Sequence, residues 1–308
     1  MKIWKIGAGA VLAASLLTLA GPVVGEMVAT LPPRFSGATP NLLDALDLSY
    51  EEVEFPTTEG LTLRGWFVPA ERRSRFAAQH SRLTPGQRAP AILYAPATSH
   101  DQRSGLTLVP AFHAAGYHVL LFSYRGHGDS DGSRLGFTYG DAESRDVDAA
   151  VRFLRRQPDM GPIVALGHSA GAVSAMLSAA RTPEIDAVVA IAPFASMTEI
   201  WHTSRPSLVP AFVLDWTMRF AELRKGFDRQ DACAVDTIER IAPRPLLIIH
   251  GAEDQRVTQT QAKRLWAAAG EPKTLWLVEG ATHDSIRGLV QDQLAPDLIA
   301  FLDAALRD

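Results

Sequence analysis

Three polar residues in the second half of the chain have the types and the order that nucleophilic acyl transfer requires. Ser169 is the centre of Gly167-His168-Ser169-Ala170-Gly171, Asp254 follows 85 residues later, and His283 follows after a further 29. A serine hydroxyl is a weak nucleophile until a histidine removes its proton, and a carboxylate must hold that histidine in the correct tautomer. We therefore predict Ser169 as the nucleophile, His283 as the base and Asp254 as the orienting acid.

The segment around Ser169 predicts a strand, a sharp turn and a helix in immediate succession. Residues 163–166 are an apolar strand-like run, and residues 172–180 are small and helix-compatible. A serine at such an apex needs a strained backbone, and glycines two residues to either side remove collisions with the neighbouring strand and the helix. The hydroxyl would then stand at a helix N-terminus, where unpaired N–H groups favour developing negative charge.

The same five-residue pattern occurs a second time, at Gly128-Asp129-Ser130-Asp131-Gly132. Two aspartates flank this serine and would oppose a developing oxyanion, and no apolar helix follows it. We therefore interpret Ser130 as part of a structural turn and keep Ser169 as the nucleophile.

Other residues compete for the two remaining roles. Glu253 is the alternative to Asp254, whereas Asp284 adjoins His283 and an adjacent carboxylate rarely folds back onto the same ring. Cys233 lies in a polar stretch without an acid and a base around it. The remaining histidines considered fall in patterns that predict structural roles: His113, His118, His168, His202 and His250.

An oxyanion hole requires two backbone N–H groups aimed at the reacting carbonyl oxygen. One belongs to the residue after the nucleophile, Ala170, and we assign the other to Ala97 in the loop after residues 91–94. No cofactor is expected. No metal site is expected either, since His100-Asp101 and His127 with Asp129 are isolated pairs.

Apolar strand-like runs alternate with helical segments through most of the chain. Behind Thr138, whose spacing to Asp141 resembles a capping box, apolar residues recur at helical spacing. Residues 106–115 also have a helical pattern, with Pro110 as a kink or in the first turn, and Pro296 begins a last helix. The predicted strands are residues 51–55, 61–68, 91–94, 119–122, 163–166, 187–192, 246–249 and 274–278. The first two form an antiparallel pair, and the rest predict an α/β fold with a mostly parallel sheet covered by helices on both faces.

Residues 196–240 interrupt this alternation and predict a small helical cap. One helical face there carries Val209, Phe212, Val213, Trp216, Phe220 and Leu223. We expect this face to cover the core; the alternative is that its aromatic residues line an acyl pocket over the active site.

The N-terminus predicts a membrane segment. Lys2 and Lys5 precede an uncharged run of 20 residues, 6–25, which as a helix spans about 30 Å, the thickness of a bilayer core. We expect residues 1–29 to be an uncleaved anchor, with a cleaved signal peptide as the alternative, which makes the protein a secreted one. The lysines place the catalytic body on the extracytoplasmic side, after a linker over residues 30–41.

Composition bounds the remaining possibilities. The 308 residues, 47% of them hydrophobic and 21% charged, suit one large domain over residues 42–308. A net charge of −4 argues against nucleic acid as a partner. The single Cys233 rules out an internal disulfide. Arginines gather in residues 71–88, where a solvated loop is the simpler interpretation and contact with lipid phosphates is the alternative.

Taken together, these motifs resemble the α/β-hydrolase superfamily. The resemblance rests on Gly167–Gly171, on His250-Gly251 with Asp254, on Gly280-Ala281-Thr282-His283, and on residues 124–132, which are similar to that superfamily's loop after the fourth strand. Membrane-anchored bacterial serine hydrolases, BEM46-like and serine-aminopeptidase-like, are the most similar groups. Ala95-Pro96 replaces the usual His-Gly before the oxyanion loop.

The resemblance implies a cofactor-independent serine hydrolase that cleaves small-molecule acyl esters through an acyl-enzyme. A peptidase or amidase of the serine aminopeptidase type is the first alternative. A non-catalytic binding protein on the same fold is the second.

Overall fold

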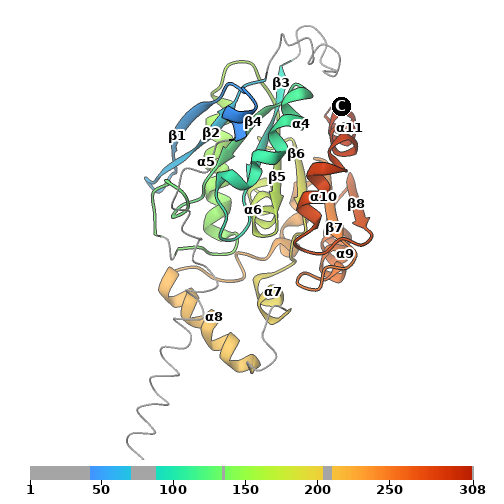
Figure 1. Cartoon of the computed structure of the whole chain (residues 1–308). Coiled ribbons are helices and arrows are strands. Elements are labelled where there is room, and N and C mark those ends of the chain that lie inside the picture. Colours follow the sequence, from blue (N-terminus) through green and yellow to red (C-terminus); the bar gives the residue numbers. More distant parts are fainter. Residues whose placement is uncertain (1–41, 71–87, 134–135, 204–209, 307–308) are drawn as a thin grey trace, which may run out of the picture.

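One eight-stranded sheet organises the protein, whose computed structural model describes residues 42–70, 88–133, 136–203 and 210–306 (Figure 1). The strand order across the sheet is β1-β2-β4-β3-β5-β6-β7-β8. β2 pairs antiparallel with β1 and with β4, and all other neighbours are parallel. The strands are β1 (Glu51–Pro56), β2 (Thr62–Val68), β3 (Ala89–Ala95), β4 (His118–Phe122), β5 (Met160–His168), β6 (Ala187–Ile191), β7 (Leu246–Gly251) and β8 (Lys273–Val278).

Helices cover both faces of this sheet. The α-helices are α2 (Leu42–Ala45), α4 (Val109–Ala114), α5 (Asp141–Arg155), α6 (Ala170–Ala179), α7 (Met197–Thr203), α8 (Ala211–Lys225), α9 (Gln259–Ala268), α10 (Ile286–Asp292) and α11 (Ala295–Ala305). Short 3₁₀ helices lie at Gln102–Leu108, Ala234–Asp236 and Ile238–Ile241. One hydrophobic cluster joins one face of the sheet to α5, α6 and α9, and a second joins the other face to α2, α4, α10 and α11.

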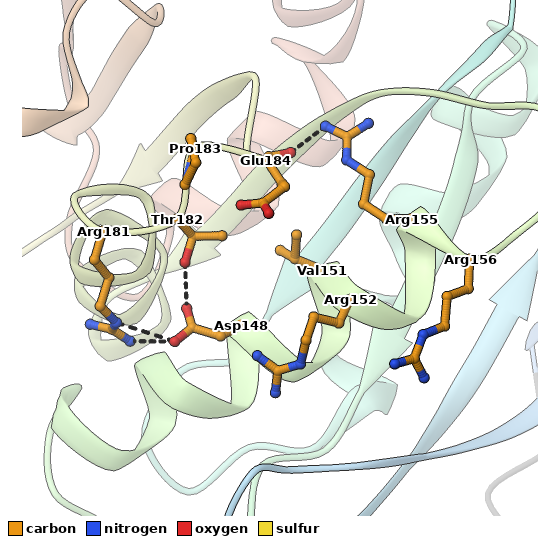
Figure 2. A pocket seen from close by; sticks show the side chains of 9 residues that line it. All are labelled: Asp148, Val151, Arg152, Arg155, Arg156, Arg181, Thr182, Pro183 and Glu184. Carbon is orange, nitrogen blue, oxygen red and sulfur yellow. Dashed lines mark hydrogen bonds and ion pairs between the residues drawn. The ribbon is translucent and has the colours of Figure 1, made fainter.

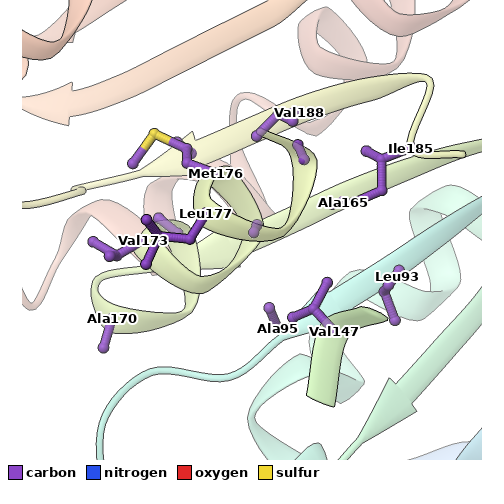
Figure 3. Close-up of a cluster of buried hydrophobic side chains, with 14 of the residues drawn as sticks. Leu93, Ala95, Val147, Ala165, Ala170, Val173, Met176, Leu177, Ile185 and Val188 are labelled. Carbon is purple, nitrogen blue, oxygen red and sulfur yellow. The ribbon is translucent and has the colours of Figure 1, made fainter. Parts of the chain in front are cut away.

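Alternate residues of the central strand enter opposite clusters. Ile163 and Ala165 pack with α5 and α6, whereas Val164 and Leu166 pack on the other side. This alternation follows from the pleat of a strand, and burial on both faces explains why β5 is a continuous apolar run. Figure 3 shows part of the first cluster, where Met176 of α6 lies near Val188 and Val147 of α5 lies beside Leu93.

The predicted α/β fold with a mostly parallel sheet is confirmed, as are the eight strands and the antiparallel opening pair. Pro110 stands in the first turn of α4, after a 3₁₀ helix, so the predicted helix over residues 106–115 is in fact two elements. The capping box was assigned to the wrong acid. The carboxylate that accepts from the N–H groups of Thr138 and Gly140 belongs to Glu143, not to Asp141, since α5 begins two residues later than the motif suggests.

The loop after β4 is fixed by a buried ion pair. Arg125 donates from Nε and Nη2 to Oδ1 of Asp146, at 2.9 and 2.7 Å, and its backbone N–H donates to Oδ2. The Asp146 side chain is fully buried and that of Arg125 nearly so. In the same loop Ser130 donates to the carbonyl of Ser123 and accepts from the N–H of Arg64, so the second glycine–serine motif builds a turn.

The segment predicted as a cap, residues 196–240, holds α7, α8 and two 3₁₀ helices. The prediction that its whole apolar face covers the core is wrong, although two residues of that face, Val213 and Phe220, are half-buried. Phe212 and Leu223 are each 72% exposed and Trp216 is 51% exposed. The residues of α8 that are buried lie on another side of the helix: Thr217, Met218, Ala221 and Glu222. Helical spacing identified the stripe correctly, but which side packs inward depends on how α8 docks.

The predicted anchor and linker, residues 1–41, lie outside the described residues, as do Val209 and most of the arginine-rich segment 71–88. Within the described part of the chain, no helix has the length and apolar character that a membrane span requires.

Candidate active site

Ser169 occupies a strained turn between β5 and α6. Its backbone has φ 55° and ψ −118°, a region that non-glycine residues rarely adopt. Its N–H donates to the carbonyl of Ile191 at the end of β6, which holds the turn against the neighbouring strand. A Cβ added at Gly171 would lie closer than 3.0 Å to the backbone of Ala95 and Pro96. The glycine is therefore required because the loop after β3 crosses directly over the start of α6.

His283 and Asp254 complete a hydrogen-bonded chain that starts at Ser169. Nε2 of His283 lies 3.2 Å from Oγ of Ser169, and Nδ1 lies 2.7 Å from Oδ2 of Asp254. The histidine and the aspartate are buried, with 6% and 3% of their surfaces exposed. Because the Asp254 carboxylate can only accept a hydrogen bond, Nδ1 of His283 must carry the ring proton. Nε2 is then unprotonated, and its lone pair faces the Ser169 hydroxyl.

Backbone hydrogen bonds hold the two loops that carry these side chains. The other carboxylate oxygen of Asp254, Oδ1, accepts from the N–H groups of Arg256 (2.9 Å) and Val257 (2.8 Å). Ala252 donates to the carbonyl of Val278 at the end of β8, and Glu253 donates to that of Ala281 in the loop that follows. Burial is the largest single influence and raises the pKa of Asp254, but the hydrogen bond and charge of His283, the N–H of Val257 and the nearby His250 together outweigh it, and the net pKa lies below its usual value.

The competing residues lie elsewhere. Glu253 is exposed, and the acid beside His283 in sequence, Asp284, instead forms a surface ion pair with Arg256 at 3.0 Å. Burial raises the pKa of the Cys233 thiol to about 11, so the residue stays a thiol at neutral pH.

The two predicted oxyanion donors lie beside the turn. Ala170 begins α6, and Ala97 is two residues beyond the end of β3, in the loop that crosses Gly171. Among the residues that the structure describes, neither backbone N–H has a hydrogen-bond acceptor. Two free donors next to a nucleophile are what a developing oxyanion needs.

Comparison with known proteins identifies the family of this chain. A family model described as serine aminopeptidase, S33 (Hydrolase_4), matches residues 97–231, which include the Ser169 turn. The uncharacterized protein Rv2307c of Mycobacterium tuberculosis is 32% identical over 240 residues, covering 76% of this chain and 72% of its own. The uncharacterized protein YfhR of Escherichia coli K12 is 27% identical over 84% of this chain and 82% of its own. The chain belongs to the α/β-hydrolase superfamily.

Solved structures share the hydrolase fold at low identity. The esterase Pf2001 of Pyrococcus furiosus superposes with a TM-score of 0.68 at 21% identity, covering 90% of this chain and 97% of its own. Est1E of Butyrivibrio proteoclasticus, solved with ferulic acid bound, gives 0.62 at 18% identity over 82% and 99%. At these identities the likeness establishes the fold alone.

Two further histidines of the hydrolase surround the acid and the base. His250 is fully buried, and its Nε2 hydrogen-bonds the carbonyl of Val257 at 2.7 Å, which fixes the Asp254 loop. The ring of His168 lies 5.5 Å from that of His283, and burial, with the neighbouring His283, lowers the pKa of His168 to about 3. A neutral His168 adds no second positive charge when the His283 imidazolium forms.

The N–H groups of Arg256 and Val257 that hold Asp254 were not predicted from the sequence. The available signal was the short loop after β7, in which a carboxylate can accept from N–H groups two and three residues ahead.

A separate hollow of about 580 Å³ opens between the carboxyl ends of α5 and α6 (Figure 2). Its lining includes Arg152, Arg155, Arg156 and Arg181, two of which are held by ion pairs, Arg155 to Asp186 and Arg181 to Asp148. These helix ends precede the amino ends of β5 and β6, so the hollow lies at the opposite edge of the sheet from Ser169. Within the described residues no group of three or more His, Cys, Asp or Glu side chains could hold a metal ion.

Proposed function

We propose that this α/β hydrolase cleaves carboxylic esters with Ser169 as nucleophile, His283 as general base and acid, and Asp254 as the orienting carboxylate. The observation that carries the proposal is the hydrogen-bonded chain from Oγ of Ser169 through the His283 ring to Asp254, at 3.2 and 2.7 Å. Both distances lie at the reach that proton transfer and tautomer control require.

The proposed reaction has two half-reactions. Nε2 of His283 takes the proton of Ser169 while Oγ attacks the ester carbonyl, and the tetrahedral oxyanion accepts from the N–H groups of Ala97 and Ala170. When the intermediate collapses, His283 returns the proton to the departing alkoxide, leaving an acyl-serine. A water molecule, deprotonated by Nε2 of the same histidine, then attacks the acyl carbon. As the second tetrahedral intermediate collapses, the C–Oγ bond breaks, His283 returns the proton to Oγ of Ser169, and the carboxylic acid is released.

The family model described as serine aminopeptidase supports a second candidate, cleavage of a peptide or amide bond. The same residues would act, but an amine leaves only after protonation, and an aminopeptidase also needs a group that binds the substrate's amino terminus. Turnover of p-nitrophenyl esters against aminoacyl p-nitroanilides separates the two. Faster cleavage of the anilides would favour the peptidase.

A fluorophosphonate probe tests the nucleophile directly. We expect the probe to label the wild type and the Ser130→Ala control, which alters the second glycine–serine motif, and not to label Ser169→Ala. Labelling of a folded Ser169→Ala variant would refute the assignment, and an unreactive wild type would favour a binding protein on this fold.

We also propose that residues 1–29 anchor the hydrolase to a membrane, with the catalytic domain on the extracytoplasmic side. The support is the uncharged run over residues 6–25 behind two lysines. Mass spectrometry of the protein recovered from membranes tests this proposal, because a mature chain that begins after residue 25 would mean signal cleavage instead.

A further inference from the structure

The side of α8 that faces away from the core carries large apolar residues along one line of the helix. We call Phe212, Trp216 and Leu223 the outer face of α8. They are spaced four and seven residues apart, and their exposed fractions are 72%, 51% and 72%. Exposed leucines and phenylalanines occur singly on most proteins, but a row of them on one helix marks an interaction surface.

The orientation of α8 is fixed by specific contacts on its other sides. Lys225 donates from Nζ to the carbonyl of Phe137 at 2.6 Å, and Glu222 is paired with Arg229 at 2.8 Å. Met218 and Ala221 are fully buried. Because these contacts hold α8 from its core-facing side, the outer face keeps its position on the surface of the domain.

The charges around the outer face are mixed, with an excess of basic residues. Arg219 lies between Trp216 and Leu223 with 62% of its side chain exposed and is paired with the buried Glu222 at 3.3 Å, a carboxylate that it shares with Arg229. Arg224 is exposed at the end of the helix. The exposed acid, Asp215, is within 3.1 Å of His202 Nε2. Large apolar residues with tryptophan and arginine at their border are the composition of helices that lie in the headgroup region of a bilayer.

We propose that the outer face of α8 docks the catalytic domain onto the surface of a lipid bilayer. This inference rests on the proposed membrane anchor. The 16 residues from 26 to 41 span up to about 55 Å when extended, and a domain of this size is about 50 Å across, so the tether allows α8 to reach the membrane. A domain held this close meets the bilayer continually, and the outer face is the described surface with the chemistry to stay there.

Docking through α8 determines where substrate enters. α7 and α8 follow β6, and the carbonyl of Ile191 at the end of that strand holds the Ser169 turn, so the helices leave the sheet at the edge that carries the nucleophile (Figure 1). The bilayer would then face the active-site side of the hydrolase, and esters dissolved in lipid are the substrate class that it meets first.

Fluorescence quenching in proteoliposomes tests the contact. The full chain carries Cys233→Ser, which removes its one thiol, and a single cysteine at Phe212→Cys or Leu223→Cys labelled with an environment-sensitive dye. The control label is at Arg152→Cys, an exposed position at the opposite edge of the sheet. In vesicles of phosphatidylcholine and phosphatidylglycerol, we expect brominated lipid to quench the labels on α8 and aqueous iodide to quench the control.

An activity measurement gives an independent readout. The double variant Phe212→Glu, Leu223→Glu should hydrolyse an ester embedded in vesicles about tenfold or more slowly than the wild type, the change expected from losing the burial of a large apolar side chain. Its rate on a water-soluble p-nitrophenyl ester should be unchanged.

The possible outcomes distinguish a failure of the docking inference from a failure of the proposed membrane anchor or of the proposed catalysis. Labels on α8 that stay open to iodide and untouched by brominated lipid overturn the inference, whether or not residues 6–25 anchor the chain. Cross-linking between two copies through position 212, without lipid quenching, also overturns it and assigns the outer face to a dimer. The quenching needs no turnover, so an inactive enzyme would refute the proposed catalysis and leave the docking result intact.

Discussion

Replacing Asp254 by asparagine changes one atom of the site and should remove most of its activity. Oδ1 of Asp254 accepts from the N–H groups of Arg256 and Val257, whereas Oδ2 accepts from Nδ1 of His283. In Asp254→Asn the amide oxygen stays with the two backbone donors, so the amide NH₂ takes the position of Oδ2. Nδ1 must then accept a hydrogen bond, the ring proton moves to Nε2, and His283 no longer presents a lone pair to Ser169.

The size of the loss follows from the alternative orientation of the amide. If the amide instead turns its NH₂ away from His283, the NH₂ faces the N–H groups of Arg256 and Val257. Both N–H groups then lose their acceptor, at a cost of about 1–3 kcal/mol for each N–H. Since each 1.36 kcal/mol corresponds to a factor of ten, the competent arrangement is populated about 30 to 3 × 10⁴ times less often. We expect kcat/KM to fall by about that factor, in line with the effect of a wrong tautomer in serine hydrolases.

Steady-state hydrolysis of a short p-nitrophenyl ester measures this loss, with circular dichroism as the check that the variant is folded. Glu253→Gln and Asp284→Asn are matched controls, because each removes a neighbouring exposed carboxylate, and both should stay within about threefold of the wild type. A folded Asp254→Asn enzyme within tenfold of the wild type would refute the reasoning, and a large loss in Glu253→Gln would move the acid to that residue.

Three further predictions concern stability. The pKa of His168 lies at about 3 instead of its ordinary 6.5. Between these two pH values the unfolded chain binds a proton at this histidine and the folded chain does not. The free energy of unfolding therefore falls as pH drops below 6.5, by up to about 1.36 kcal/mol per pH unit. His168→Gln should flatten this slope in urea titrations from pH 7 to 5, and parallel curves would contradict the assignment. Gly171→Ala should lower the free energy of unfolding by about 1–3 kcal/mol or more, because its Cβ would meet backbone atoms. The control for thermal melting is Gly288→Ala, whose Cβ has no atom within 4 Å. Similar melting temperatures of the two variants would argue against the close crossing of the β3 loop over α6. Asp146→Ala leaves the guanidinium of Arg125 without its carboxylate and should lower the free energy of unfolding by about 3–5 kcal/mol. Asp284→Asn removes an exposed carboxylate and should lower it by less than about 0.5 kcal/mol. Equal urea midpoints for the two variants would contradict this prediction.

The local architecture of the nucleophile could be predicted from sequence because its causes are local. An apolar strand, two glycines and a run of small residues were enough to predict the turn at Ser169 between β5 and α6. The order of strands and helices was predictable for the same reason, since burial on both faces of a parallel sheet leaves continuous apolar runs. Short helices such as α10 were missed because seven residues are too few to establish a period.

The orientation of α8 is the clearest case that tertiary structure alone decided. Its sequence has one strongly apolar stripe with Phe212, Trp216 and Leu223, whereas the side that is buried carries Thr217, Met218, Ala221 and Glu222. Helical periodicity therefore favoured the side that the structure leaves exposed. The bonds from Lys225 to Phe137 and from Arg229 to Glu222 join residues outside any local pattern, and they turn the buried side inward.

From its sequence alone, this protein could be assigned a fold class and three chemically competent residues in a set order. The contact between Ser169 and His283 spans 114 positions and that between His283 and Asp254 spans 29. Only the folded sheet, which brings the carboxyl ends of β5, β7 and β8 to one edge, determines that these side chains meet. The same holds for the two N–H groups that orient Asp254, because a hydrogen bond depends on tenths of an ångström that residue spacing does not encode.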